Sequence, residues 1–340
     1  MSKQNPGYGL AHPHHPSSMK QVYLLGAGFT RAIMGQKAFL TDEIMPKLSL
    51  SGFPEIMEDY EKMFPDIEQF ITELDLRCLR FAKNNLSFSK RLNEIRDNIV
   101  EQIVRMYDID ALSVDDLDKF TDLKKFIETV LVQSTILALN YDLVLDQGLW
   151  LSKRWHPCKG YDDISSSSCY GDENREKDNI LLLKLHGSCN FRKSSLHGSE
   201  YLVDNEYPVV EINDKIFPGI HSSHRAVQDS GPHVLVMSYL KIPHNGIMQL
   251  WRKTLEALTN ADRLTIIGCS LRDEDTFLKF ALYHFGMKKN IGNFTIEIID
   301  KGIDNCKNIE TKIKNLVAYP DKQDITLYDG LVAYLEGANA

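Results

Sequence analysis

Two polar residues stand directly after apolar segments of the sequence and could act on a substrate. Asn140 follows residues 134–139, and His186 follows residues 180–185. A carboxamide can bind a sugar hydroxyl or a water molecule, and an imidazole can accept and return a proton near neutral pH. Together they predict acid–base chemistry on a polar substrate, although a core histidine and a self-bonded turn asparagine remain the structural alternatives.

More polar residues follow other apolar segments. Gly268 and Ser270 come after residues 263–267, and Asp142 lies two residues beyond Asn140. The segment 295–300 ends in Asp300. Ligands of open parallel sheets bind outside the carboxyl ends of the strands, so we expect these residues to meet there. Ser270 could instead cap the helix that follows it.

The stretch "YLLGAGFTRA" (23–32) predicts a strand, a tight turn at Gly26-Ala27-Gly28 and a helix. Helix N-terminal amides favour an anion, commonly a phosphate. Thr30 and Arg31 would add a hydroxyl and a cation close to a diphosphate. The dehydrogenase fingerprint requires a third Gly or Ala where Arg31 stands, so a bound redox dinucleotide fits poorly. A simple strand-to-helix turn remains the structural alternative.

Six short apolar runs predict the elements that position these residues. Continuous apolar runs are typical of parallel strands buried on both faces. The fold class is therefore expected to be α/β, with a Rossmann-like, doubly wound parallel sheet. The predicted strands are residues 21–26, 134–139, 180–185, 233–238, 263–268 and 295–300.

A helical subdomain is expected between the first two strands. Apolar residues keep helical spacing in two stripes there: Ile67, Phe70, Ile71, Leu74 and Cys78, and Leu92, Ile95, Ile99, Ile103 and Met106. We expect an insertion over residues 46–125, with the sheet domain over 19–45 and 126–340. Residues 1–18, rich in His and Pro, are expected to be a flexible tail. Loops 152–179 and 192–231 have no assigned role.

Composition limits the class of protein. The chain has 340 residues and a formal net charge of −8, which gives no general attraction to nucleic acid or to an anionic membrane. No apolar run is long enough to span a membrane. The six cysteines are scattered without a C-x-x-C pair, so a reduced, cytoplasmic setting is expected.

Four segments in order, "LLGAGFTR", "LALNYD", "LKLHGS" and "IIGCSLRDED", resemble the sirtuin superfamily. They resemble most its sirtuin-like NADase branch, found in bacterial anti-phage defence. The resemblance covers about residues 20–45, 130–190 and 233–300. It implies a Rossmann-type domain that binds NAD+ as a substrate and cleaves the bond between nicotinamide and ribose.

The resemblance also implies roles for individual residues. Gly26, Ala27 and Gly28 match the family's phosphate loop, Asn140 its ribose-side asparagine, and His186 its catalytic histidine. The adenosine half is expected near Gly268, Ser270 and Asp300, and Asp142 matches the aspartate after the asparagine. In addition, we expect Phe29 to cover the nicotinamide face and Asp42 to lie close to the same pocket.

Two departures from the deacylase branch bear on the substrate. The four-cysteine zinc ribbon that follows His-Gly in protein-deacylating sirtuins is missing, as is their "Pro-Asp-Phe-Arg" segment. No metal is therefore expected; the alternative zinc ligands are His156, Cys158 and Cys169, whose spacing is irregular. An NAD-dependent protein deacylase is correspondingly disfavoured.

An enzyme that depletes cellular NAD+ must be controlled. We expect a regulated effector of anti-phage defence, in a homo-oligomer or with an activating partner. The resemblance implies a ring ATPase or a nucleotide-sensing protein as that partner. The main alternative is a catalytically silent sensor or assembly subunit that binds NAD or ADP-ribose. The activating signal, the oligomer number and the choice between ADP-ribose and a cyclic product stay open.

Overall fold

The structure of the protein is a computed structural model, and it describes most of the chain. The described residues are 20–49, 64, 66–108, 112–130, 132–161, 169–170, 179–194, 207–222, 232–235, 238–239, 245–285, 287, 294–317 and 323–337. The expected tail, residues 1–18, lies outside them, as do parts of the two long loops, 152–179 and 192–231.

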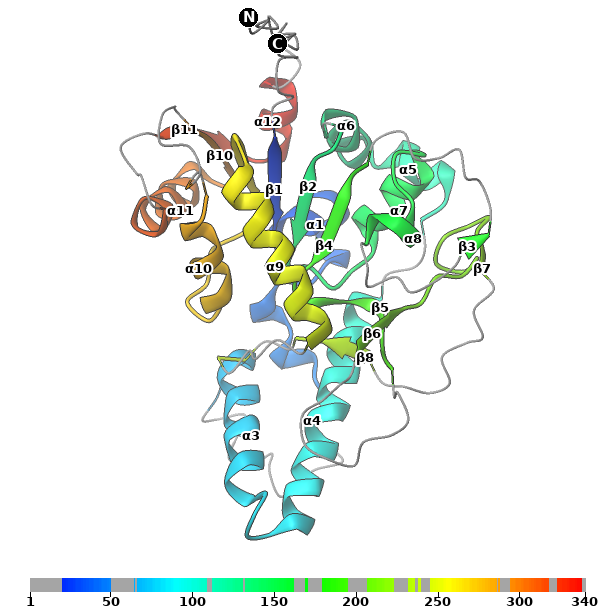
Figure 1. Ribbon diagram of the computed structural model, residues 1–340, viewed down its shortest axis with the longest axis vertical. Helices are drawn as coiled ribbons and strands as arrows, with labels where there is room; N and C mark the ends of the chain where they lie inside the picture. Colours follow the sequence, from blue (N-terminus) through cyan, green and yellow to red (C-terminus); the bar gives the residue numbers. More distant parts are fainter. Residues whose placement is uncertain are drawn as a thin grey trace, which may run out of the picture.

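A six-stranded parallel sheet lies at the centre of the fold, in the order β11-β10-β9-β1-β2-β4 (Figure 1). Its strands are β1 (Gln21–Leu25), β2 (Thr135–Ala138), β4 (Leu181–Lys184), β9 (Arg263–Ile267), β10 (Phe294–Asp300) and β11 (Gln323–Asp329). Every residue of β1 is buried, because neighbouring strands flank it and helices cover the sheet. The expected α/β, Rossmann-like class is confirmed.

One predicted strand belongs to another sheet, and one strand of the main sheet was not predicted. Residues 233–238 were expected in the main sheet, but β8 (Pro232–Val234) pairs antiparallel with β5 (Gly187–Ser194). With β6 (Tyr207–Val210) they form a separate three-stranded sheet. The strand β11 was not predicted, because its exposure alternates along an edge strand and no continuous apolar run marks it.

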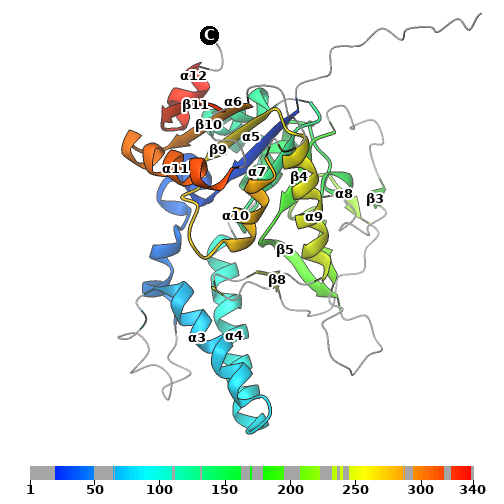
Figure 2. The same cartoon turned by 60° about the vertical axis from the view of Figure 1, so that its left-hand side comes forward.

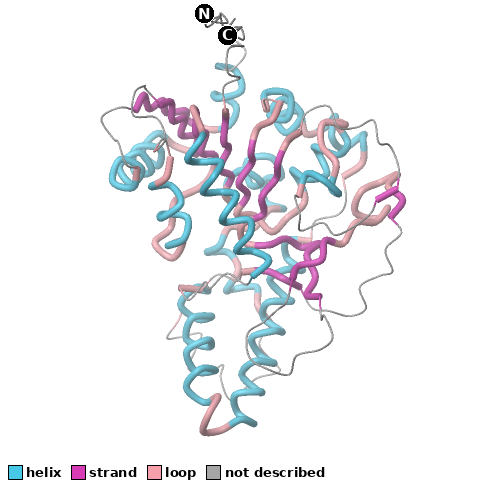
Figure 3. The backbone as a smooth tube through the Cα atoms, in the orientation of Figure 1, coloured by secondary structure: helices cyan, strands magenta, loops and turns pink. Residues whose placement is uncertain are grey.

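Helices surround both sheets (Figure 3). Their bounds are α1 (Ala27–Met34), α3 (Ile67–Phe81), α4 (Leu86–Tyr107), α5 (Val114–Lys119), α6 (Thr121–Thr129), α7 (Val144–Leu151), α8 (Pro157–Gly160), α9 (Asn245–Asn260), α10 (Thr276–Tyr283), α11 (Ile303–Leu316) and α12 (Leu331–Gly337). Three single-turn helices follow α1: η1 (Gly35–Lys37), η2 (Thr41–Glu43) and η3 (Met45–Lys47). A further short pair, β3 (Cys169–Tyr170) and β7 (His221–Ser222), is antiparallel. Among the described helices, none has both the length and the apolar character needed to cross a bilayer.

The helices α3 and α4 extend away from the main sheet as an antiparallel pair (Figure 2). Each begins at a capped residue: Asp66 accepts a hydrogen bond from the Glu68 amide, and Asn85 accepts one from the Phe88 amide. Their predicted apolar stripes pack together in a small core that also includes Tyr141 and Cys189.

The insertion ends earlier than expected. Residues 112–125 were assigned to it, but Leu112, Leu117 and Leu123 belong to the large core under the main sheet. Here α5 and α6 pack against α7, so they are part of the sheet domain. The apolar spacing of a helix does not reveal which core it enters, so the sequence placed this boundary too late.

Candidate functional site

A cavity of about 310 Å³ lies at the carboxyl ends of the central strands. Its walls come from the turns after β1, β2, β4 and β9, from the last residue of β10, from η2, and from the facing helices α3 and α4. Parallel strands deliver their loops to one edge, so residues distant in sequence meet there. Nine residues singled out from the sequence line this cavity: Gly26, Ala27, Gly28, Asp42, Asn140, His186, Gly268, Ser270 and Asp300.

The three glycines of the site allow two turns to pack against each other. A Cβ atom on Gly26 would lie 2.4 Å from the Gly268 carbonyl oxygen, and one on Gly28 would lie 2.7 Å from the Gly268 Cα. Gly268 has a φ of +58°, and a Cβ there would lie 2.3 Å from the Phe29 nitrogen. The glycines therefore serve first to bring backbone close to backbone.

This packing also occupies part of the expected anion site. The Gly26 amide donates to the Ile267 carbonyl, and the Gly28 amide donates to the Gly268 carbonyl, each at 3.0 Å. The amide of Ala27, the first residue of α1, has no acceptor among the described residues. An anion at this turn would therefore meet the positive end of α1 and the Ala27 N–H group.

Asn140 has one amide atom bonded and one unpaired. Its Nδ2 donates to the Thr30 hydroxyl at 2.8 Å, and that hydroxyl donates to Asp142 Oδ2 at 2.8 Å. Its Oδ1 is buried and has no hydrogen-bond partner among the described residues. Because Asn140 lines the cavity, this oxygen is a fixed acceptor for a ligand that donates a hydrogen bond.

Thr30 and Asp142 were expected to contact the ligand, but the structure places both behind the cavity wall. Both side chains are buried and act on Asn140 instead. Burial raises the pKa of Asp142, and the nearby Lys184 ammonium and the Thr30 hydroxyl partly oppose this effect. The prediction that Thr30 and Asp142 contact the ligand rested only on their positions in the sequence, close to the phosphate turn and to Asn140.

Phe29 and Arg31 also differ from expectation. Phe29 is 1% exposed and packs edge-to-face on Phe126 with a centroid distance of 4.8 Å, so it points into the core. The expected cover for a nicotinamide ring is therefore wrong. The Arg31 guanidinium binds both carboxylate oxygens of Glu43 and the Ala38 carbonyl, so it is not turned toward a diphosphate. Residues on successive positions of a helix point in different directions, which sequence proximity ignores.

A buried ion pair that the sequence did not reveal supports the loop of Asn140. Lys184, at the end of β4, donates to the Asp142 carbonyl and lies 3.2 Å from Asp146 Oδ2. The Tyr161 hydroxyl donates to the other Asp146 oxygen. Lys184 stands in an apolar run, "LLLKL", and such a lysine signals a buried partner elsewhere in the fold.

His186 lies beside a carboxylate that was not singled out from the sequence. Its Nε2 is 3.2 Å from Asp275 Oδ1, and both residues line the cavity. The only signal in the sequence is the position of Asp275 in "RDED", close to the predicted ligand loop. Tyr141 stands next to the imidazole with its ring centroid 6.5 Å away, and burial raises the pKa of its phenol well above the usual value.

The start of the loop after β9 and Asp300 also line the cavity. Burial raises the pKa of Asp300, although the Lys301 amide donates to its carboxylate. Lys312 of α11 donates to the carbonyls of Ser270 and Leu271 and fixes this loop. Leu271 holds a φ of +49°, which is a costly conformation for leucine and marks a loop kept in place by its surroundings.

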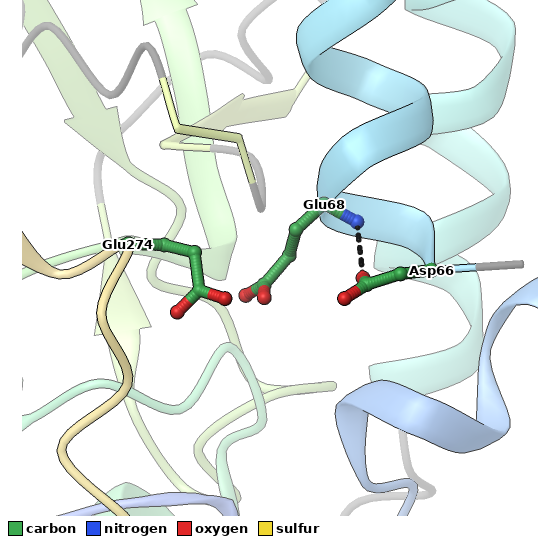
Figure 4. Close-up of side chains that lie close together, drawn as sticks. All are labelled: Asp66, Glu68 and Glu274. Atoms are coloured by element: carbon green, nitrogen blue, oxygen red, sulfur yellow. Dashed lines mark hydrogen bonds between the residues drawn. The ribbon is translucent and has the colours of Figure 1, made fainter. Parts of the chain in front are cut away.

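Three carboxylates from two elements gather beside the cavity (Figure 4). Oxygens of Asp66, Glu68 and Glu274 lie within 4.8 Å of one another. However, Asp66 caps α3, and Glu68 Oε2 lies 2.9 Å from the guanidinium of Arg272. The Arg272 cation offsets part of the negative charge of the cluster, and Asp66 already serves as a helix cap, so we assign no metal to it.

The alternative zinc ligands do not form a site. Cys158 is disulfide-bonded, so it offers no thiolate, and the His156 Nδ1 accepts a hydrogen bond from the Cys158 amide. The disulfide also departs from the expectation that all cysteines are reduced. Zinc requires several deprotonated ligands in one tetrahedral arrangement, and the described side chains of His156 and Cys158 do not provide it.

Comparisons with known proteins give only distant likenesses. No family model matches the chain, and no curated protein matches it. A solved Sir2 homologue in complex with NAD is 11% identical, with a TM-score of 0.38, over 94% of this chain and 91% of that chain. A structure on the mechanism and regulation of Sir2 enzymes is 10% identical, with a TM-score of 0.36, over 94% and 92%. Scores this low add no argument about the function of this chain.

Proposed function

We propose that the chain binds NAD+ as a substrate and hydrolyses the bond between nicotinamide and ribose, yielding nicotinamide and ADP-ribose. The observation that carries this proposal is the buried Oδ1 of Asn140, which is unpaired among the described residues and belongs to a side chain that lines the same cavity as His186. A sugar hydroxyl or a water molecule would supply the hydrogen bond that this oxygen lacks.

The proposed chemistry suits these two groups. Nicotinamide leaves as a neutral molecule from a cationic ring, so no acid is needed to expel it. The ribose carbon becomes cationic as the bond breaks, and a positioned acceptor stabilises that charge. Water adds to the carbon, and His186 takes the proton that the water releases. Asn140 holds a ribose hydroxyl or the water in line for attack.

We propose an orientation of the dinucleotide from the residues that line the cavity. The nicotinamide riboside half belongs near Asn140 and His186, and the pyrophosphate near the Ala27 amide. The adenosine half belongs near Ser270 and Asp300, whose carboxylate can accept hydrogen bonds from ribose hydroxyls.

The direct test is a product assay on NAD+ with single variants. We expect His186→Ala and Asn140→Ala each to lower nicotinamide release by about 10²-fold or more, because each removes a group that acts on the reacting centre. NAD+ should still bind to both variants in calorimetry. The matched control is His284→Ala at the end of α10, outside the cavity, which should keep full activity.

Turnover that persists in both variants would contradict the assigned roles. Saturable NAD+ binding without turnover, under every partner condition, would instead identify a silent sensor or assembly subunit. Nicotinamide release that requires an acetyl-lysine peptide would identify a deacylase.

The biological setting proposed from the sequence resemblance is anti-phage defence by NAD+ depletion in the cytoplasm. We propose that a homo-oligomer or an activating partner, a ring ATPase or a nucleotide-sensing protein, controls the activity. Exposed aromatic side chains on α10, Phe277, Phe280 and Tyr283, support a contact with another protein surface. Equal specific activity with and without candidate partners, over a range of concentrations, would count against this control.

A further inference from the structure

We propose that Asp275 is a positioning residue for His186: its carboxylate fixes the proton on Nε2, leaves Nδ1 as the basic nitrogen and stabilises the imidazolium. Only the expected effect of Asp275 on catalysis rests on the proposed NAD+ hydrolysis. The pairing itself is carried by geometry, since Nε2 lies 3.2 Å from Asp275 Oδ1.

The Asp275 side chain does not cap the helix that it precedes. Asp275 is the N-cap residue of α10, a position where an aspartate ordinarily accepts a hydrogen bond from a helix amide. Here its side chain makes no capping bond and lies against His186. The carboxylate therefore lies at the imidazole in place of the capping hydrogen bond that would stabilise α10.

Burial makes the pairing strong. His186 is 7% exposed and Asp275 is 9% exposed, so little water screens the two groups. An ionised carboxylate only accepts hydrogen bonds, so the imidazole nitrogen that faces it must carry the proton. Nδ1 is then the atom that can take a proton from water as the water oxygen bonds to the ribose carbon and nicotinamide departs. The positive charge that forms on the ring lies next to the Asp275 carboxylate.

Other titratable groups surround the imidazole, and their charges must be considered. Tyr141, from the loop after β2, stays neutral because burial raises its pKa, and the same holds for Tyr107 of α4. Glu68 of α3 is paired with the Arg272 guanidinium. Glu274 neighbours Asp275 in the chain; burial raises its pKa, but hydrogen bonds with Glu68 and Tyr239 outweigh this and lower it. Asp42 of η2 lines the same cavity. The Asp275 carboxylate lies against the ring, with Oδ1 3.2 Å from Nε2.

The first test reads the imidazole directly by NMR of the full chain with 15N- and 13C-labelled histidine. The His186 signals are assigned by their loss in His186→Gln. Above the pKa of the ring, the wild-type protein should show a protonated Nε2 and an unprotonated Nδ1. A proton on Nδ1 instead would overturn the proposal, and this measurement needs no Asp275 variant to fold.

The second test follows the titration of His186 in charge variants. Asp275→Asn should lower the His186 pKa by about 1–3 units, because an opposite charge close to a ring favours its protonated form. Asp275→Glu should restore part of this shift. The control is Asp273→Asn, in the same loop; its side chain is 84% exposed and pairs with Lys279, so the His186 pKa should stay unchanged. Equal pKa values in wild type and Asp275→Asn, or an equal shift in both Asn variants, would refute the pairing.

The kinetic consequence separates this inference from the proposed function. Asp275→Asn should lower kcat by about 10²-fold with KM little changed, and move the acid limb of the pH–rate profile to lower pH by the shift seen in NMR. A His186 titration that shifts in a protein without NAD+ hydrolysis would overturn the proposed function and keep the pairing. Normal turnover, together with an unshifted titration, would keep the function and overturn the pairing.

Discussion

At the scale of single residues, the site depends on one chain of hydrogen bonds behind the cavity wall. Asn140 donates to Thr30, and Thr30 donates to Asp142, so the amide has one orientation. The buried Oδ1 that this leaves unpaired costs about 1–3 kcal/mol of stability. A ligand that donates to this oxygen removes the cost, so part of the binding free energy is prepared by the fold.

The buried charge of Asp142 predicts a specific dependence of stability on pH. Its pKa is raised above 3.8 by burial, so between 3.8 and the raised value the folded state binds more protons than the unfolded state. The contribution of Asp142 to stability therefore decreases as pH rises through this window. In Asp142→Asn this contribution is absent. We expect the wild type, measured relative to that variant, to be more stable at the acidic end of the window than at pH 7.

Urea unfolding of both proteins at several pH values checks this expectation. The difference between the two unfolding free energies should fall with rising pH and then level off. Asp116→Asn is a suitable comparison, because hydrogen bonds from Ser113 and Lys119 lower the pKa of this exposed carboxyl to about 2. A wild-type advantage over Asp142→Asn that grows with pH would show that Asp142 is stabilised as an anion.

At the scale of elements, the contact between the turns after β1 and β9 sets the shape of the cavity. Those strands are neighbours in the sheet, so their turns emerge side by side at the same edge. Glycines at positions 26, 28 and 268 let the turns touch. The turn after β9 then continues through Ser270 and Leu271, which Lys312 holds by their carbonyls.

Gly268→Ala should therefore destabilise the protein far more than the addition of one methyl group suggests. The position has a positive φ, and the new Cβ would also overlap the backbone at Phe29 and Gly28. We expect the free energy of unfolding to fall by about 3 kcal/mol or more, and NAD+ binding to be lost. Gly219→Ala is the matched control: its φ is +82°, but no atom lies within 4 Å of the added Cβ. This control should lose only about 1 kcal/mol. Chemical denaturation of both variants gives the two decreases in unfolding free energy. Similar decreases would mean that the positive φ, and not the overlap with the backbone, accounts for the destabilisation.

At the scale of the whole molecule, the helical pair and the sheet domain are joined at the site. Glu68 of α3 is 2% exposed and pairs with Arg272 of the loop after β9, and both residues line the cavity. Tyr141, from the loop after β2, packs into the core of the helical pair and donates to the Leu235 carbonyl. The cavity thus depends on contacts between two bodies with separate cores.

The Glu68–Arg272 pair can be tested by a double-variant cycle. Arg272→Gln should cost about 2 kcal/mol, because the Glu68 carboxylate would lose its guanidinium while staying buried. Adding Glu68→Gln should recover much of that loss, since the uncompensated charge is removed. Urea unfolding of the four proteins gives the coupling energy. Additive losses would show that the two side chains do not stabilise each other across this boundary.

Five of the six predicted strands could be placed from apolar runs alone, because a parallel strand buried on both faces leaves a continuous signal. The edge strand β11 leaves no such signal, since it is half exposed. The sixth run, residues 233–238, corresponds to the short β8, which pairs outside the main sheet. The sequence also indicated nine residues that now line one cavity. Eight of them lie at or just after the end of a strand, and strand ends share an edge; the ninth, Asp42, lies in η2.

The sequence by itself determined the parallel sheet, the glycine turn and the arrival of Asn140 and His186 at one edge, because these follow from local apolar pattern and strand direction. Only the tertiary structure decided which side chains face the cavity. It turned Phe29 into the core, placed Thr30 and Asp142 behind Asn140, and brought Asp275 to His186. The physical reason is that side-chain direction and pairing depend on contacts between segments far apart in the chain, which local spacing does not encode.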